Sequence, residues 1–95
     1  MIIQIIKLKT SLSEEEVLKI AREREPKFQA LPGLLQKYYV KLGQPYQFGG
    51  IYIWDSMESL KTFRESDLAA GIPAAYKLIE PPDIEIFEGL FQLRD

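Results

Sequence analysis

The sequence predicts one α+β domain, residues 1–95, in which a four-stranded antiparallel sheet carries its helices on one face. Three observations lead to this class. A chain of 95 residues has the length of a single domain. Runs rich in β-branched residues and segments of helical spacing follow one another in the order βαββαβ. A short turn joins the two middle strands, which is typical of a hairpin.

The first strand and the first helix are predicted in the N-terminal third. Ile2 to Lys9 is a run rich in β-branched residues, as expected of a strand. Ser11 and Ser13 are each followed three residues later by a glutamate, and either pair has the spacing of a capping box. We therefore expect a helix to begin near Ser13 and to run towards Ala30. Pro26 removes an amide donor and should end or kink this helix near Glu25.

The central hairpin comes next. Leu34 to Leu42 is the second predicted strand, and Gln47 to Trp54 is the third. Gly43-Gln44-Pro45 between them has the residue types of a tight turn.

The last part of the chain supplies the second helix and the fourth strand. Asp55 and Glu58 have capping-box spacing, and helical periodicity continues to about Leu68. Residues 69–79 contain glycine and proline, so we expect a short helical or irregular segment there. A strand from about Asp83 to Phe91 then completes the ferredoxin-like order, with both helices on one face.

The strands are apolar at both alternating parities. A sheet with helices on one side and water on the other is apolar at one parity only. In the first predicted strand Ile2, Ile6 and Leu8 point to one side and Ile3 and Ile5 to the other. In the third strand Tyr52 and Trp54 oppose Ile51 and Ile53, and in the last strand Ile84 and Ile86 oppose Phe87 and Phe91. Soluble monomers rarely expose so large an apolar patch. We expect a second copy of the chain to cover it in a symmetric homodimer, because no residues remain to build a third layer.

Composition excludes several classes of function. The chain has 12 Lys+Arg and 14 Asp+Glu, so no broad positive field attracts nucleic acid or an anionic membrane. Histidine and cysteine are absent, which removes imidazole catalysis, thiolate chemistry and the usual metal ligands. No apolar run is long enough to cross a bilayer, and the N-terminus has the pattern of a strand rather than of a signal peptide. We expect a cytoplasmic protein with no nucleic-acid or membrane partner and no metal.

Two segments carry a resemblance to a known family. They are Leu31-Pro32-Gly33-Leu34-Leu35, and Gly49-Gly50-Ile51-Tyr52-Ile53-Trp54-Asp55-Ser56 followed by Glu58-Ser59-Leu60. Together with the order of elements they resemble the dimeric α/β-barrel superfamily that includes the antibiotic-biosynthesis monooxygenases. The likeness is strongest to its YdhR-type monooxygenases.

This resemblance implies a dimeric α/β barrel with a ligand pocket between sheet and helices. Some members oxygenate polycyclic aromatic substrates without metal or flavin, so the resemblance implies that no cofactor is needed. Other members bind haem through a histidine or place a histidine on the second helix. This chain has none and departs from those branches.

Arg24 is the most informative single residue. Val17, Ile20 and Phe28 form an apolar stripe on the predicted first helix, and Arg24 lies in its middle. A guanidinium there must be paired, reach an edge or face a polar cavity, because an unpaired buried charge is too costly. Two interpretations stay open: a salt bridge or edge exposure near Pro26, and an anchor for an anionic or enolate-like oxygen.

Aromatic side chains complete the predicted pocket. Its ligand-binding set is Arg24, Tyr39, Tyr52, Trp54 and Phe63, in which a flat ligand is sandwiched and a phenol donates to a carbonyl or oxyanion. Core and dimer packing explains the same aromatic residues without a ligand. Gly49-Gly50 permits close approach of a ligand or, alternatively, a β-bulge. A further set, Lys7, Lys9, Lys37 and Lys41, is expected at strand ends, where lysines keep edges soluble.

The function predicted from these features is that of a cofactor-independent monooxygenase-like protein acting on or binding a small aromatic, quinol- or polyketide-like compound. Such a protein deprotonates an electron-rich phenol or enol and lets the carbanion meet dioxygen in a dry pocket. The base must then be a tyrosine, lysine or carboxylate with a shifted pKa, and the sequence identifies none. The alternative is a non-catalytic dimeric small-ligand-binding or stress-response module. An RNA-recognition module shares the topology, but the basic residue that its core motif requires is missing.

Overall fold

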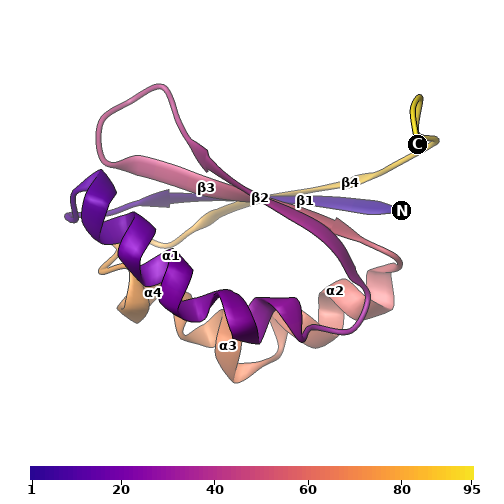
Figure 1. The fold of residues 1–95 in the computed structure, drawn as a ribbon, viewed down its shortest axis with the longest axis horizontal. Coiled ribbons are helices and arrows are strands. Elements are labelled where there is room, and N and C mark those ends of the chain that lie inside the picture. The colour runs from indigo at the N-terminus through magenta and orange to yellow at the C-terminus, as the bar shows by residue number, and fades with distance from the viewer.

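The computed structural model describes all residues from Met1 to Asp95. The elements are β1 (Ile2–Lys9), α1 (Glu14–Gln29), β2 (Leu34–Lys41), β3 (Gln47–Trp54), α2 (Met57–Arg64), α3 (Asp67–Ala70), α4 (Ile72–Ala75) and β4 (Asp83–Glu88). The strands form one antiparallel sheet in the order β2-β3-β1-β4, and the helices lie together on one side of it (Figure 1). The predicted α+β class and ferredoxin-like order are confirmed.

The strand register assigns each side chain to a face of the sheet. Gln4 pairs with Tyr52 and with Ile86, and these residues face the helices together with their second neighbours along each strand. The opposite, outer face carries Ile3, Ile5, Tyr38, Ile51, Ile53 and Phe87. Tyr38 is 55% exposed and Phe87 is 48% exposed, because no helix covers this side. The prediction that both faces are apolar is therefore confirmed.

Helix α1 begins as the sequence predicts. Ser13 is its N-cap: the hydroxyl accepts a hydrogen bond from the amide of Glu16, and the Glu16 carboxylate accepts from the Ser13 amide. The helix continues past Pro26 to Gln29 with Ala30 as its C-cap, so the expected run towards Ala30 is confirmed and an end near Glu25 is wrong. Proline removes only its own amide donor, and its carbonyl still accepts from the amide of Ala30 at 3.2 Å.

Helix α2 has a different cap and a different end from those expected. Ser56 rather than Asp55 is the N-cap, with its hydroxyl accepting from the amide of Ser59. Asp55 instead accepts hydrogen bonds from the hydroxyls of both serines. The helix ends at Arg64, before the predicted Leu68, because Ser66 caps a new short helix, α3. The irregular segment that follows contains α4, as expected from its glycine and proline.

Strand β4 ends at Glu88 rather than at the predicted Phe91. Its partner β1 begins at Ile2, which pairs with Glu88, so no strand remains to pair with the residues beyond. Leu90, Phe91 and Leu93 accordingly lie outside the sheet and are 91%, 79% and 84% exposed. The assignment of Phe91 to the outer face of the strand is therefore wrong.

The core lies between the sheet and the helices. Trp54 and Leu60 are completely buried, and the indole amine of Trp54 donates to the side-chain oxygen of Gln4 at 3.0 Å. This bond satisfies a polar group that interrupts an otherwise apolar strand. None of the four helices has the length and apolar character of a membrane span.

Gly33, between α1 and β2, is essential to this fold. Its φ of 79° is in the left-handed region, and a Cβ there would overlap Ser59 and the Asp55 carboxylate. We expect Gly33→Ala to lower the free energy of unfolding by about 1–3 kcal/mol or more, because it combines backbone strain with a clash. Urea denaturation measures this, with Gly43→Ala, whose Cβ meets no atom, as the control. Equal stability of the two variants would contradict the prediction.

Candidate functional site

An apolar cavity lies between the sheet and α1. It has a volume of about 160 Å³ and opens to solvent. Its walls come from three strands, α1 and the region of α4: Ile6 and Leu8 of β1, Val17, Ala21 and Phe28 of α1, Tyr39 of β2, Phe48, Gly50 and Tyr52 of β3, and Ile72 and Tyr76 near α4. We call this space the first cavity. Mostly apolar walls with few polar groups are typical of a small-molecule site.

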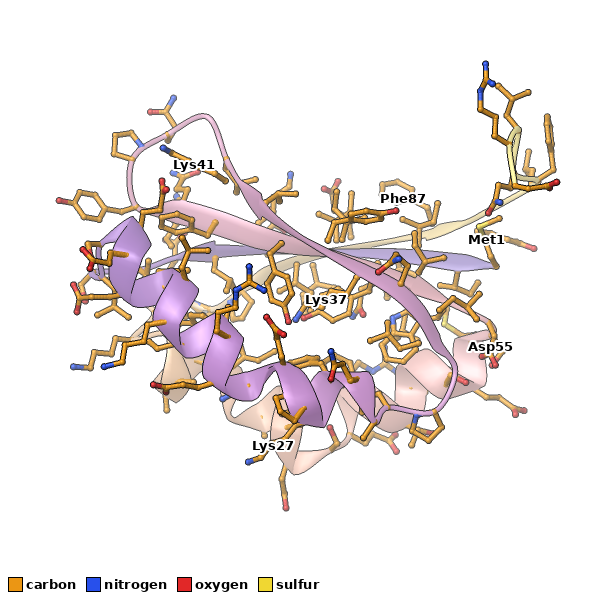
Figure 2. The ribbon with its side chains drawn as sticks, viewed as in Figure 1. Met1, Lys27, Lys37, Lys41, Asp55 and Phe87 are labelled. Carbon is orange, nitrogen blue, oxygen red and sulfur yellow. The ribbon has the colours of Figure 1, made fainter.

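Lys37 supplies the principal charged group of the first cavity. Its side chain lies between the sheet and the helices (Figure 2). The Nζ atom is 3.5 Å from the ring centre of Phe28, 4.2 Å from that of Tyr39 and 4.5 Å from that of Tyr52. The expectation that Lys37 keeps a strand end soluble is therefore wrong, because its amine lies inside the fold.

Lys7, Lys9 and Lys41 behave as expected of strand-end lysines. Each has an acidic partner, with N–O distances of 3.0, 3.0 and 2.8 Å to Glu85, Glu80 and Glu14 respectively. Lys37 has no such partner. It is the one lysine of the four whose amine contacts aromatic rings instead of a carboxylate.

A β-bulge in β2 directs Lys37 inward. Leu34 pairs with Trp54, but Gln36 pairs with Ile53, so one extra residue is inserted between them. Simple alternation from Leu34 would place Gln36 on the helix side and Lys37 outside. The bulge reverses this, and Lys37 pairs with the buried Tyr52. The bulge thus lies in β2 and not at Gly49-Gly50, where it was considered.

Gly50 makes room for this arrangement. A Cβ at this position would lie 2.9 Å from the Tyr52 ring and 3.3 Å from Cε of Lys37. The missing side chain thus lets the lysine and the tyrosine share the cavity wall.

The environment of Lys37 favours its neutral amine. Burial, and then the positive charge of Arg24, lower the pKa of Lys37 from its ordinary 10.5 to about 7. The faces of the three aromatic rings favour the ammonium form. They therefore oppose the effect of lost hydration on the pKa but do not cancel it. At neutral pH the cavity therefore holds an amine that is protonated in about half of the molecules.

Three phenols line the first cavity together with this amine, and the rings of Tyr39 and Tyr52 lie next to it. Tyr52 is only 3% exposed and Tyr76 7%, and no protein group hydrogen-bonds either hydroxyl. Burial raises the pKa of Tyr52 well above its ordinary value and that of Tyr76 to about 12, and it also raises the pKa of Tyr39. All three phenols stay protonated at neutral pH and are free to donate a hydrogen bond to a ligand.

Arg24 lies beside the first cavity rather than in its wall. Its Nη2 donates to the carbonyl of Leu68 at 3.0 Å, and its guanidinium carbon is 5.8 Å from the Phe28 ring and 6.0 Å from the Tyr76 ring. It forms no ion pair, so the salt bridge considered from the sequence is absent. Its buried Nε has no hydrogen-bond partner. Arg24 thus contributes positive charge to the site without neutralisation by a carboxylate.

The remaining predicted site residues lie deeper. Trp54 is stacked on Tyr52 with ring centres 6.2 Å apart, and Phe63 contacts both rings at 5.4 and 5.6 Å. Neither lines the first cavity, whereas Tyr39 and Tyr52 do. Phe63 lines a second cavity of about 170 Å³ that also contacts Gln4 and Arg64. The structure thus brings Tyr39 and Tyr52 together with Lys37, which the prediction omitted.

Lys37 also leads to a prediction on stability. Its folded-state pKa of about 7 lies below the ordinary 10.5, so between these values the folded chain binds fewer protons than the unfolded chain. The stability of the wild type should then rise with pH across this window. We expect Lys37→Met to be more stable than wild type by about 0.5–2 kcal/mol below pH 7, since it removes a buried charge. This advantage should shrink as the pH rises towards 10.5. Urea denaturation across this pH range checks it, and a pH-independent difference would contradict it.

No protein-family model and no curated protein matches the sequence. Solved structures do match. NE2512 of Nitrosomonas europaea, a protein of unknown function, has a TM-score of 0.80 at 21% identity and covers 99% of this chain and 93% of its own. SnoaB of Streptomyces nogalater, a cofactor-independent oxygenase, has a TM-score of 0.77 at 10% identity, with 99% and 97% covered.

A third structure extends the comparison. A protein from Deinococcus radiodurans, named as a candidate antibiotic biosynthesis monooxygenase, has a TM-score of 0.75 at 17% identity, with 100% and 98% covered. The resemblance to YdhR-type proteins in particular stays a prediction. The three likenesses extend over almost the whole of each chain, and the chain therefore has the ferredoxin-like fold of the antibiotic-biosynthesis-monooxygenase structures.

Proposed function

We propose that the protein binds a small electron-rich phenol in the first cavity and oxygenates it with dioxygen, using no cofactor. The observation that carries this proposal is the unpaired amine of Lys37, which lies among unpartnered phenols in an apolar cavity. It supplies the base that the sequence did not identify. The fold shared with a cofactor-independent oxygenase also supports the proposal.

The reaction begins with proton transfer. The neutral amine of Lys37 takes the proton of the substrate phenol, and the resulting phenolate carries electron density to the ring carbon opposite the oxygen. That carbon transfers electrons to dioxygen and forms a C–O bond, which gives a peroxide on the ring. Loss of the ring proton and cleavage of the O–O bond then yield a quinone and water. All electrons come from the substrate, so no other reductant is needed.

The surrounding residues suit each charged species. The phenols of Tyr39, Tyr52 and Tyr76 remain protonated and donate hydrogen bonds to the phenolate or peroxide oxygen. Arg24 adds positive charge that favours both anions. The mostly apolar walls lower the local dielectric, which strengthens these interactions.

The size of the cavity limits the substrate. A cavity of about 150 Å³ accommodates benzene, and the first cavity measures about 160 Å³. We therefore propose a single-ring phenol of the resorcinol type, which is the ring pattern of simple polyketides.

We also propose that the protein acts as a homodimer joined through the outer face of the sheet. The six apolar residues of that face form a continuous patch across all four strands. Monomeric soluble proteins rarely leave such a patch in water. An identical sheet is self-complementary under two-fold symmetry and closes the assembly.

Oxygen uptake with 5-methylresorcinol tests the proposed reaction. Uptake of one dioxygen per ring, with one atom of isotopically labelled dioxygen in the quinone, is the expected result. Lys37→Met should lose this uptake. Lys27→Met is its matched control, because Lys27 is exposed on α1 and points away from the sheet (Figure 2). Tight binding of the phenol without oxygen uptake would overturn the oxygenase and favour the non-catalytic binding module.

A further inference from the structure

The Lys37 amine has the surroundings of a nucleophile as well as of a base. Its Nζ lies in the first cavity over the rings of Phe28, Tyr39 and Tyr52, and no carboxylate or hydrogen-bond acceptor contacts it. A lysine placed in an apolar pocket beside another cation is the kind that attacks carbonyl carbons. Arg24 is that second cation here.

We propose that Lys37 forms an imine with small aromatic aldehydes and ketones that enter the first cavity. This activity goes beyond the proposed oxygenation, since it requires no dioxygen and takes a carbonyl compound in place of a phenol. It uses the same cavity and the same amine.

Imine formation requires only the lysine amine and the carbonyl compound. The lone pair of Nζ attacks the carbonyl carbon, a C–N bond forms, and the C=O electron pair moves to oxygen. One proton moves from nitrogen to that oxygen and gives a carbinolamine. The hydroxyl then leaves as water when it takes a second proton, and the C=N bond forms as an iminium. Loss of the remaining N–H proton gives the neutral imine, so the net products are imine and water.

Residues around Lys37 are suited to both the addition to the carbonyl group and the loss of water. Tyr39, Tyr52 and Tyr76 stay protonated, and their unpartnered hydroxyls are available to donate to the carbonyl oxygen and then to the departing hydroxyl. The iminium keeps a positive charge close to where the ammonium had it, over the faces of three aromatic rings. These ring faces favour the iminium cation as they favour the ammonium form of the lysine.

The lining and the volume of the first cavity indicate the class of substrate. Twelve of the 17 lining residues are hydrophobic, and the volume of about 160 Å³ matches a single aromatic ring. Benzaldehyde has this size and a carbonyl that stands outside the ring, where it can reach the amine.

Reductive trapping tests the inference. The full chain is incubated with benzaldehyde and cyanoborohydride under argon at about pH 7, and tryptic peptides are identified by mass spectrometry. About half of the Lys37 amines are neutral and nucleophilic at this pH and lie in an apolar cavity that binds the aldehyde, so we expect the adduct at Lys37 to form at least about tenfold faster than at the exposed Lys27. Equal rates at the two lysines would overturn the inference.

Two further measurements separate this site from a surface reaction. Lys37→Arg keeps the positive charge but lacks the nucleophilic amine, so the fast adduct should disappear while labelling of Lys27 is unchanged. In the wild type, benzyl alcohol fills the same cavity and should slow labelling of Lys37 alone; equal slowing at Lys27 would overturn the inference. Trapping under argon is independent of oxygenation. An adduct without oxygen uptake overturns the proposed function only, and uptake without an adduct overturns this inference only.

Discussion

Lys37→Met should lower kcat/KM for oxygenation of 5-methylresorcinol by about 10²–10⁴-fold, the contribution of a well-placed general base. Methionine has nearly the same length and still fills the space over Phe28, Tyr39 and Tyr52. The loss should therefore come from proton transfer rather than from a collapsed cavity. Oxygen-electrode rates at several phenol concentrations measure it. An unchanged KM together with the reduced kcat would locate the defect in the chemical step.

The pH profile of the wild type separates a base from a merely structural lysine. The amine accepts a proton only when neutral, and the pKa of Lys37 is lowered to about 7 by burial and by Arg24. Oxygen uptake should thus rise with pH, reach half its maximum near pH 7 and level off above it. In Lys37→Arg this inflection should vanish, since arginine does not deprotonate in this range. An inflection that persists in the variant would assign the titration to another group.

Much of the fold was predictable because it depends on local signals. Ser13 caps α1, and Gln47 to Trp54 form β3, both as predicted, because capping and alternation act over a few residues. The two errors have different causes. The length of β4 depends on where β1 begins, which cannot be read from β4 itself. The end of α2 has a local cause, because Ser66 caps α3 through the amide of Ala69 and thereby interrupts the helical periodicity.

The site was less predictable, and a single bulge explains why. The sequence of β2 has no clean alternation, so nothing in it shows that the register shifts between Leu34 and Gln36. Without that shift Lys37 belongs with the soluble strand-end lysines; with it, the amine lies next to Tyr52. The one available signal was that Tyr38 and Tyr39 directly follow Lys37. This indicates apolar surroundings for the lysine only once it is known which side of β2 faces the helices.

Ile51→Lys should convert the proposed dimer to a monomer. Ile51 lies on the outer face in the middle of the sheet, paired with Ile5 on one side and Tyr38 on the other. A two-fold axis would place two lysines in a largely apolar interface. A buried unpaired charge costs several kcal/mol, so the dissociation constant should increase by at least about 1000-fold. Sedimentation at micromolar concentration measures the change.

The fold of each subunit should survive this substitution. In a separated chain the outer face is in water, where a lysine is well solvated, and the cavity lies on the opposite side of the sheet. Circular dichroism and phenol binding should therefore stay close to wild type while the assembly dissociates. Ile79→Lys is the matched control, because Ile79 is 67% exposed and lies outside the sheet. A wild type that sediments as a monomer, or an Ile51→Lys variant that remains dimeric, would show that the outer face is not the interface.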